Sequence, residues 1–418
     1  MSMVLGWIVA SVFVILLSGM LAGYLTRCQA PHNLWRLAFG AFSLRIGYVF
    51  FDSIVGFYSG GGDESGYETT IWFVAQQWQS GVLFAPLQYG LAPGNTANYM
   101  LLYTTLFSPA YAFFGRIQLL PRLQMALIGS FVVVNVYLIA NLLWDHQAGM
   151  IAGGITMIFP YWVVLSGILY RDMLIIFFLS AVVYFTVRWQ SGEHTRRLLL
   201  LVVVTTVSAV SLRLQNLFVI GALFATAALL FIGRDVRGLV TSTAVGILFV
   251  GLMYARFGKE ILLSELAGRR SWLARSAPGS YLTGLTYESL YELFVFAPIG
   301  ALHFALVPFP WHVVNLLSTI AFLQNLVLWY PVVICALFGF RDVLTRQRGS
   351  ELVLPLIVFS LAGLLGYGLV EGNVGPAMRH RSQFQFVFFI LAGVAVSRRL
   401  SVKLSDRCVT SSDEIRNT

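Results

Sequence analysis

Long apolar runs, separated by short polar segments, fill nearly the whole chain. Many of the runs are about 20 residues long, the length that an α-helix needs to cross roughly 30 Å of hydrocarbon. They are continuous and do not alternate apolar with polar residues, so they predict helices and not the strands of an outer-membrane barrel. The pattern therefore predicts an all-α, polytopic membrane protein.

The basic residues fall in clusters between the runs, and the positive-inside rule places those clusters in the cytoplasm. Eleven spans, with the N-terminus outside and the C-terminus inside, place these basic clusters in the cytoplasm. The predicted spans cover residues 3–24, 37–58, 123–143, 147–168, 173–190, 197–212, 216–233, 238–255, 314–340, 351–370 and 382–398.

Two further apolar stretches, residues 99–115 and 290–312, would break the charge rule if either one alone crossed the membrane. We interpret both as helices at the outer membrane surface; if both cross, the count becomes thirteen. The prediction is one transmembrane domain over residues 1–400. Within it, residues 59–122 form a first outer loop with surface helices and residues 256–313 a second large outer segment. Residues 401–418 are expected to be a polar, disordered cytoplasmic tail.

Composition agrees with a membrane protein and excludes a soluble enzyme. The chain of 418 residues is 58% hydrophobic and 11% charged, with a mean hydropathy of +0.79. The net charge of +9 could suggest nucleic acid. However, all basic residues except Lys259 and Lys403 are arginines, and they are scattered over many loops. We expect this charge to set topology and bind phosphate, and we expect no nucleic-acid partner.

The first candidate site is the polar, Gly-rich stretch of residues 59–98, which contains Asp63, Glu64 and Glu68 but no Lys or Arg. It is expected to face away from the cytoplasm. Glycines let the backbone approach a substrate closely, and a carboxylate at the membrane rim can act as a general base toward a hydroxyl. Asp63 is the candidate base and Glu64 the alternate. An ordinary solvated loop would have the same acidic residues.

The second candidate is Asp172, which follows Arg171 in the sequence SGILYRDML at the outer end of a predicted helix pair. An Asp in a first helical turn also complements the helix dipole, which is the structural alternative. The predicted topology places Asp172 on the same face as Asp63.

The third candidate is the turn GNVGPAMRHR, which places Arg379, His380 and Arg381 outside, where the topology rule disfavours positive charge. Guanidinium groups match phosphate oxygens bidentately, so this group predicts a phosphate-bearing lipid ligand. Pairing with Glu371 or with lipid headgroups is the alternative. Arg213 ends a span on the outer side and could bind substrate or extend to the interface.

No nucleotide-binding motif and no metal-ligand pattern of His and Cys occurs in the sequence. We therefore expect no cofactor. A divalent metal ion is compatible with the sequence but is not implied by it.

These residues resemble the GT-C superfamily of multi-spanning glycosyltransferases, which use polyprenyl-phosphate-linked sugars. Asp63, Glu64 and Tyr67 match the acidic residues and Tyr of that family's first outer loop, and SGILYRDML with Asp172 matches its second. The similarity covers about residues 55–190 and returns in the PFPW stretch and the GNVGPAMRHR turn. The chain departs from the family in an additional N-terminal helix. It also has a lone Asp172 where oligosaccharyltransferases carry a pair.

The resemblance implies transfer of a sugar from a polyprenyl-phosphate-linked donor to a hydroxyl of a glycan or protein acceptor, at the outer face of the cytoplasmic membrane. Asp63 would be the base of an inverting reaction, while Arg379 and Arg381 would hold the departing phosphate. His380 could donate a proton, Asp172 would orient Arg171 or the acceptor, and Tyr67 and Arg213 would contact substrate. A polysaccharide polymerase is a related alternative. A flippase or transporter of lipid-linked sugars is the competing class, although it predicts ionisable residues deep in several spans.

Overall fold

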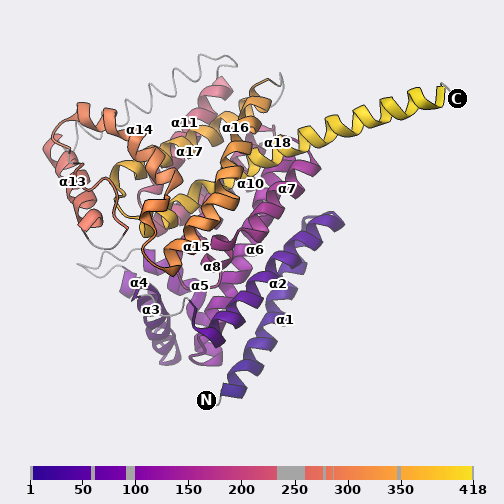
Figure 1. Ribbon diagram of the computed structural model, residues 1–418. Coiled ribbons are helices and arrows are strands. Elements are labelled where there is room, and N and C mark those ends of the chain that lie inside the picture. The colour runs from indigo at the N-terminus through magenta and orange to yellow at the C-terminus, as the bar shows by residue number, and fades with distance from the viewer. Residues whose placement is uncertain are drawn as a thin grey trace. The chain divides into compact units, whose positions relative to one another are not determined.

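The computed structural model describes residues 3–57, 62–90, 99–232, 259–275, 279–285, 287–345 and 350–416. Within these ranges the regular secondary structure is helical, and an isolated bridge pairs Ser280 with Asn373. The prediction of an all-α protein is confirmed (Figure 1).

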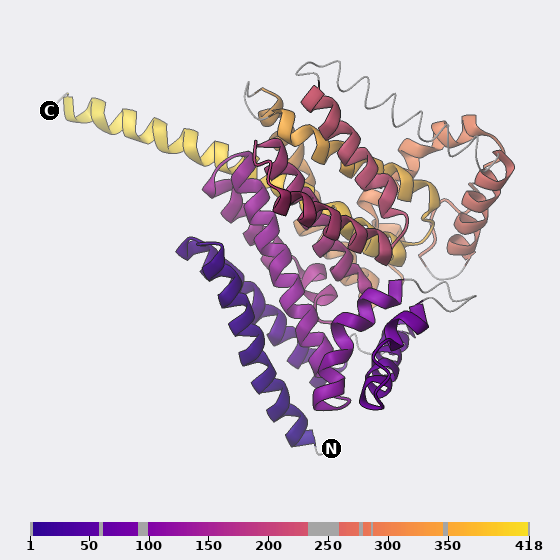
Figure 2. The same ribbon diagram turned by 180° about the vertical axis from the view of Figure 1, so that it is seen from behind.

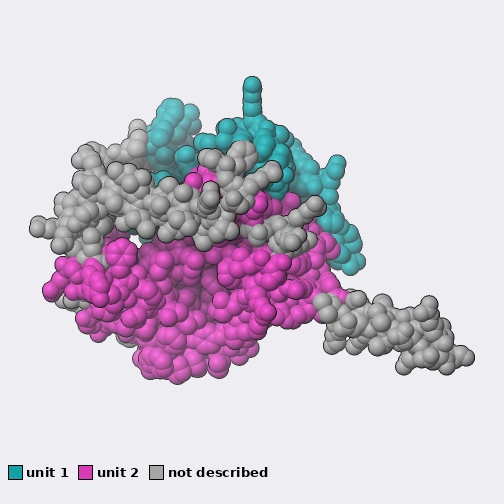
Figure 3. All heavy atoms as spheres, turned by 90° about the horizontal axis from the view of Figure 1, so that it is seen from above, with its two compact units in different colours: residues 1–135, 156–221 teal, residues 136–155, 222–418 magenta. Residues whose placement is uncertain are grey.

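The chain divides into two compact units, coloured in Figure 3, and each is described by itself. Unit 1 comprises residues 1–135 and 156–221, and unit 2 comprises residues 136–155 and 222–418. Three helices contribute residues to both units: α6 (Leu119–Leu143), α7 (His146–Ile158) and α11 (Asn216–Ile232).

Unit 1 contains the N-terminal helices, and α1 packs beside α2 in the views of Figures 1 and 2. Helix α3 packs against α5, and α9 packs against α10. Its complete helices are α1 (Met3–Arg27), α2 (His32–Val55), α3 (Gly62–Gln79), α4 (Ala85–Gly90), α5 (Tyr99–Phe114), α8 (Pro160–Leu165), α9 (Arg171–Gln190) and α10 (Arg196–Leu212).

Unit 2 is organised around α18, which packs along α16 and α17, while α14 packs along α17. Its complete helices are α13 (Lys259–Arg275), α14 (Leu290–Leu306), a short turn at Pro310–His312, α15 (Leu316–Gln324), a π-helical turn at Asn325–Trp329, α16 (Tyr330–Leu344), α17 (Ser350–Val370) and α18 (Val374–Arg416).

Seven helices in the described part of the chain are long and apolar enough to cross a membrane. We therefore describe the chain as an integral membrane protein. The seven segments are Leu5–Arg27, His32–Val55, Leu119–Leu143, Arg171–Gln190, Leu316–Leu344, Glu351–Val370 and Val374–Ser401. Shorter apolar helices lie at Met100–Phe114, Asn216–Leu230 and Tyr291–Leu306.

The structure differs from the eleven expected spans at identifiable places. The expected span 147–168 is two helices, α7 and α8, that meet at Pro160. Proline has no N–H to donate to the carbonyl four residues earlier, so the helix is interrupted there. Helices α10 and α11 coincide with the expected spans 197–212 and 216–233, but with 17 residues each they are shorter than the seven candidate spans. The expected span 238–255 lies outside the described residues.

Arg45 on α2 stabilises the end of α7. Its guanidinium donates to the carbonyls of Thr156 at 3.4 Å and Met157 at 3.5 Å. The Thr156 carbonyl would otherwise pair with the N–H that Pro160 lacks. Because Arg45 is fully buried, this contact supplies donors that water cannot provide at that depth.

Glycines allow the helices of unit 2 to approach closely. A Cβ at Gly339 on α16 would lie 1.9 Å from the carbonyl oxygen of Leu391 on α18, and one at Gly393 would lie 2.6 Å from the carbonyl oxygen of Ala148 on α7. These contacts fix α7, α16 and α18 against one another.

The C-terminal segment differs from its expected state. Helix α18 continues through residues 401–416, which the sequence predicted to be disordered. Once a helix is nucleated, extending it adds one hydrogen bond per residue, so a polar continuation can remain helical.

We expect Gly339→Ala to destabilise the protein by about 1–3 kcal/mol, because the added methyl group overlaps the backbone of α18. Thermal unfolding of the purified protein in detergent measures this. Gly366→Ala is the matched control, since nothing lies within 4 Å of a Cβ there, and alanine favours a helix. Equal melting temperatures for the two variants would contradict the tight α16–α18 contact.

Candidate functional site

The predicted site residues fall into two groups that belong to different units, and each group is described separately. Unit 1 holds Asp63, Glu64, Tyr67, Arg171, Asp172 and Arg213. Unit 2 holds Arg379, His380 and Arg381.

A buried arginine joins two carboxylates in unit 1. Arg122, at the start of α6, donates to Asp52 Oδ2 at 2.9 Å and lies 2.8 Å from Glu64 Oε1. All three residues are at most 6% exposed. The guanidinium therefore offsets the charge of two acids that would otherwise repel each other in a region of low polarity.

Glu64 also connects the two acidic loops that the sequence places far apart. Its Oε1 accepts a hydrogen bond from the Leu169 N–H at 3.2 Å. The Leu169 carbonyl in turn accepts from the Tyr103 hydroxyl at 2.9 Å, and Tyr67 packs on the Tyr103 ring at 5.0 Å between centroids. The start of α3 and the segment before α9 therefore lie together.

The charges around Tyr103 also indicate that the start of α3 and the segment before α9 lie together. Burial raises the pKa of the Tyr103 phenol, and the charges of Glu64 and Asp172 raise it further. Tyr103 therefore stays protonated at neutral pH and can donate its hydrogen bond to the Leu169 carbonyl.

Asp63 and Glu64 have different environments although they are adjacent. Both lie in the first turn of α3. The Asp63 side chain is exposed, whereas Glu64 is buried and held by Arg122. Of the two, Asp63 can approach a substrate, and Glu64 fixes the helix that presents it.

Asp172 is fully buried at the start of α9. Its Oδ1 lies 3.3 Å from Nη2 of Arg213, which ends α10. Arg171 instead donates to the Leu212 carbonyl at 3.2 Å. Both contacts join α9 to the end of α10, and Asp172 pairs with Arg213.

In unit 2, Arg381 is buried and committed to the end of α14. Its Nη1 donates to the carbonyls of Ala305 at 2.9 Å and Val307 at 2.7 Å, and its Nη2 donates to Asn325 Oδ1 at 3.1 Å. The guanidinium also lies over the Trp329 ring, 5.1 Å from its centroid. At 1% exposure, Arg381 connects α14, the π-helical turn and α18.

Arg379 and His380 are partly exposed on the same turn of α18. His380 Nδ1 donates to Glu371 Oε1, and Glu371 itself is 2% exposed. A carboxylate that holds one ring nitrogen fixes the orientation of the imidazole. Glu371 therefore positions His380, which is the pairing that the sequence left as an alternative.

Tyr281 and Arg270 support this turn from the preceding segment. Arg270 Nη1 donates to the Glu371 carbonyl at 3.0 Å, and the Tyr281 N–H donates to the Gly372 carbonyl at 2.8 Å. Burial raises the pKa of the Tyr281 phenol, and the nearby Glu371 carboxylate raises it further. The Tyr281 hydroxyl therefore remains a hydrogen-bond donor.

Sequence reasoning missed Asp52 and Arg122, which organise the unit 1 group. Asp52 lies within the predicted span 37–58 and Arg122 ends the predicted first outer loop. The sequence did contain one signal for this group: Asp52 is a carboxylate inside an apolar run, and such a residue usually has a partner. Asn325 in unit 2 was missed as well, because a single polar residue of this kind gives no periodic signal.

In the described part of the chain, no three or more His, Cys, Asp or Glu side chains gather as ligands for a metal ion. Asp172, the acidic residue of the second loop, is engaged with Arg213. In comparisons with known proteins, neither a family model nor a curated protein matches this chain.

We expect Arg122→Gln to destabilise the protein by about 3–5 kcal/mol, because it leaves Asp52 and Glu64 buried without their guanidinium. Unfolding of the detergent-solubilised protein measures the loss. Arg116→Gln is the matched control: Arg116 pairs with Glu68 at 2.6 Å but is 46% exposed, so about 0–1 kcal/mol should be lost. A similar loss in both variants would argue against a special role for Arg122.

Proposed function

We propose that the protein is an integral membrane glycosyltransferase that moves a sugar from a polyprenyl-phosphate-linked donor to a hydroxyl of a glycan or protein acceptor. The observation that supports it most is that two adjacent carboxylates have different environments. Glu64 is buried and ties α3 to the segment before α9, while Asp63 beside it is exposed. A rigid helix that presents one accessible carboxylate fits the requirement for a positioned base.

The ends of three candidate spans meet at this group of residues. Asp52 is near the end of the span His32–Val55, Arg122 is near the start of Leu119–Leu143, and the span Arg171–Gln190 begins just after Leu169. A site at span ends lies at the level of lipid headgroups, where the phosphate and sugar of a lipid-linked donor would also lie.

In the proposed reaction, Asp63 accepts the proton of the acceptor hydroxyl as its oxygen attacks the anomeric carbon. The bond between that carbon and the phosphate oxygen breaks, and its electron pair leaves with the polyprenyl phosphate. One new glycosidic bond replaces one sugar–phosphate bond, so the step needs no oxidant or reductant. A single in-line displacement inverts the anomeric configuration.

The other residues of unit 1 have positioning roles in this proposal. The Asp172–Arg213 pair and the Arg171–Leu212 contact hold the start of α9 against the end of α10. Tyr67 packs on Tyr103, whose hydroxyl fixes the Leu169 carbonyl. These contacts maintain the shape of the acidic surface without supplying a second base.

Within unit 2 we propose Arg379 and His380 as the residues that bind a lipid phosphate. Both are partly exposed, and Glu371 orients the imidazole. Arg381 is already engaged with two carbonyls and Asn325, so we assign it a structural role. Arginine suits a phosphate because its planar fork can donate two parallel hydrogen bonds.

The proposal includes the eleven-span arrangement in the cytoplasmic membrane, with Asp63 on the outer side. Ser65 and Ser191 are both exposed, and the predicted topology places them on opposite sides. In a cysteine-free background, an impermeant thiol reagent applied to intact cells should label Ser65→Cys, and should label Ser191→Cys only after permeabilisation. The reverse pattern would contradict the orientation.

Asp63→Asn should fold normally but lose at least about 100-fold in transfer rate, because the amide keeps the size of the side chain and removes its basicity. Transfer from a labelled polyprenyl-phosphate donor by the purified protein measures this. Ser65→Ala, an exposed position in the same turn, is the control and should retain activity. If wild-type protein releases no polyprenyl phosphate from the donor with any acceptor, a carrier function is favoured over the enzyme.

Arg379→Lys should slow transfer about tenfold or more with little change in stability, since a point ammonium loses the bidentate contact. Arg381→Lys should instead lower the melting temperature, because lysine cannot span two carbonyls and Asn325 at once. Measuring rate and melting temperature for both variants separates the roles. If Arg381→Lys lowered the transfer rate and left the melting temperature unchanged, Arg381 would instead be assigned to the phosphate site.

A further inference from the structure

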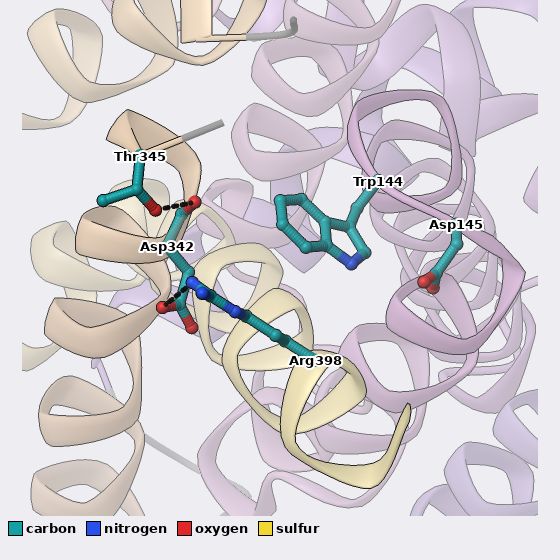
Figure 4. A pocket seen from close by; sticks show the side chains of 5 residues that line it. All are labelled: Trp144, Asp145, Asp342, Thr345 and Arg398. Carbon is teal, nitrogen blue, oxygen red and sulfur yellow. Dashed lines mark hydrogen bonds and ion pairs between the residues drawn. The ribbon is translucent and has the colours of Figure 1, made fainter. Parts of the chain in front are cut away.

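A second polar site lies in unit 2, away from the residues discussed above. Trp144, Asp145, Asp342, Thr345 and Arg398 line an open pocket of about 420 Å³. Figure 4 shows the Trp144 indole on one side of the pocket and the Asp342–Arg398 ion pair on the other. The first two residues join α6 to α7, the next two end α16, and Arg398 belongs to α18.

The pocket lies where three candidate spans end, at Leu143, Leu344 and Ser401. Along α18, Arg381 and Arg398 are 17 residues apart, which corresponds to about 26 Å of helix. That distance is close to the thickness of the hydrocarbon layer. Because three candidate spans end beside the pocket, we expect it to lie at the level of the lipid headgroups.

The lining carries both signs of charge. Asp145 and Asp342 are acidic, while Arg398 contacts Asp342 and Arg399 lies 4.0 Å from it. The lining itself therefore has two carboxylates and one guanidinium group, and Arg399 lies outside it. A lining with both signs of charge and more acidic than basic groups suits a ligand that has a positive and a negative group, and it does not favour a purely anionic one.

We propose that this pocket binds the headgroup of a phospholipid with a phosphate and a primary ammonium, such as phosphatidylethanolamine. The phosphate contacts Arg398, which uses one Nη for Asp342 and has further N–H groups to donate. The ammonium lies near Asp145 and Asp342, with the Trp144 ring as a cation–π surface. Trp is also a typical residue of the membrane interface.

The walls of the pocket are fixed before any ligand arrives. Asp145 Oδ1 accepts from the Ala148 N–H at 2.6 Å, and both of its carboxylate oxygens accept from the Ser397 hydroxyl at 3.0 Å. Each carboxylate oxygen has more than one acceptor site, so capacity remains for an ammonium group. The Gly339 and Gly393 contacts hold α16, α18 and α7 together beside it. Preorganisation of this kind lowers the cost of binding.

The headgroup preference gives a direct test. A primary ammonium donates three hydrogen bonds, whereas the quaternary ammonium of phosphatidylcholine donates none. Native mass spectrometry of the purified full-length protein, titrated with either lipid, should show phosphatidylethanolamine bound about tenfold more tightly. Asp342→Asn should reduce that ratio toward one. Arg398→Gln should weaken both lipids about equally.

Arg341→Gln is the matched control, because Arg341 is exposed near the same end of α16 but is not among the residues that line the pocket. It should leave the lipid preference unchanged. Equal binding of the two lipids by the wild-type protein would overturn the proposal. So would tighter binding of phosphatidylglycerol, which would indicate a site for anionic lipid, or an unchanged ratio in Asp342→Asn.

Discussion

Backbone carbonyls at the C-terminal ends of helices need donors, and buried or partly buried arginines supply them at four helix ends in the described part of this protein. Arg45 donates to the end of α7, Arg171 to α10, Arg270 to α17 and Arg381 to α14. The last carbonyls of a helix have no intrahelical partner, and in a membrane water cannot replace one. A guanidinium satisfies several carbonyls at once and complements the negative end of the helix dipole.

This constraint changes the meaning of the arginine-rich composition. From the sequence, the arginines were expected to set the topology and to bind phosphate. The structure adds a third role, in which arginines stabilise the ends of helices. An arginine that is buried among carbonyls, such as Arg381 at 1% exposure, has both Nη groups engaged and is a poor candidate for a substrate contact. The partly exposed Arg379, on the same turn, is the better one.

The acidic residues follow a similar division. Arg122 draws Asp52 and Glu64 into the interior and thereby fixes the start of α3 and the segment before α9. Asp172 forms an ion pair with Arg213. Asp63 is left exposed by this arrangement, because its neighbour carries the structural contact. Within unit 2, polar groups form the mixed-charge pocket at the end of α18 that carries Arg398, far along the helix from Arg381.

The sequence by itself determined that the protein is helical and embedded in a membrane, since apolar runs of span length allow no other backbone arrangement in hydrocarbon. The interruption at Pro160 could also be read from it, because proline acts on its own helix. Only the tertiary structure decided which ionisable groups pair. Glu64 and Arg122 are 58 residues apart, and Asp172 and Arg213 are 41 apart. Such partners are chosen by how helices pack, and helix packing depends on side chains from several distant segments at once.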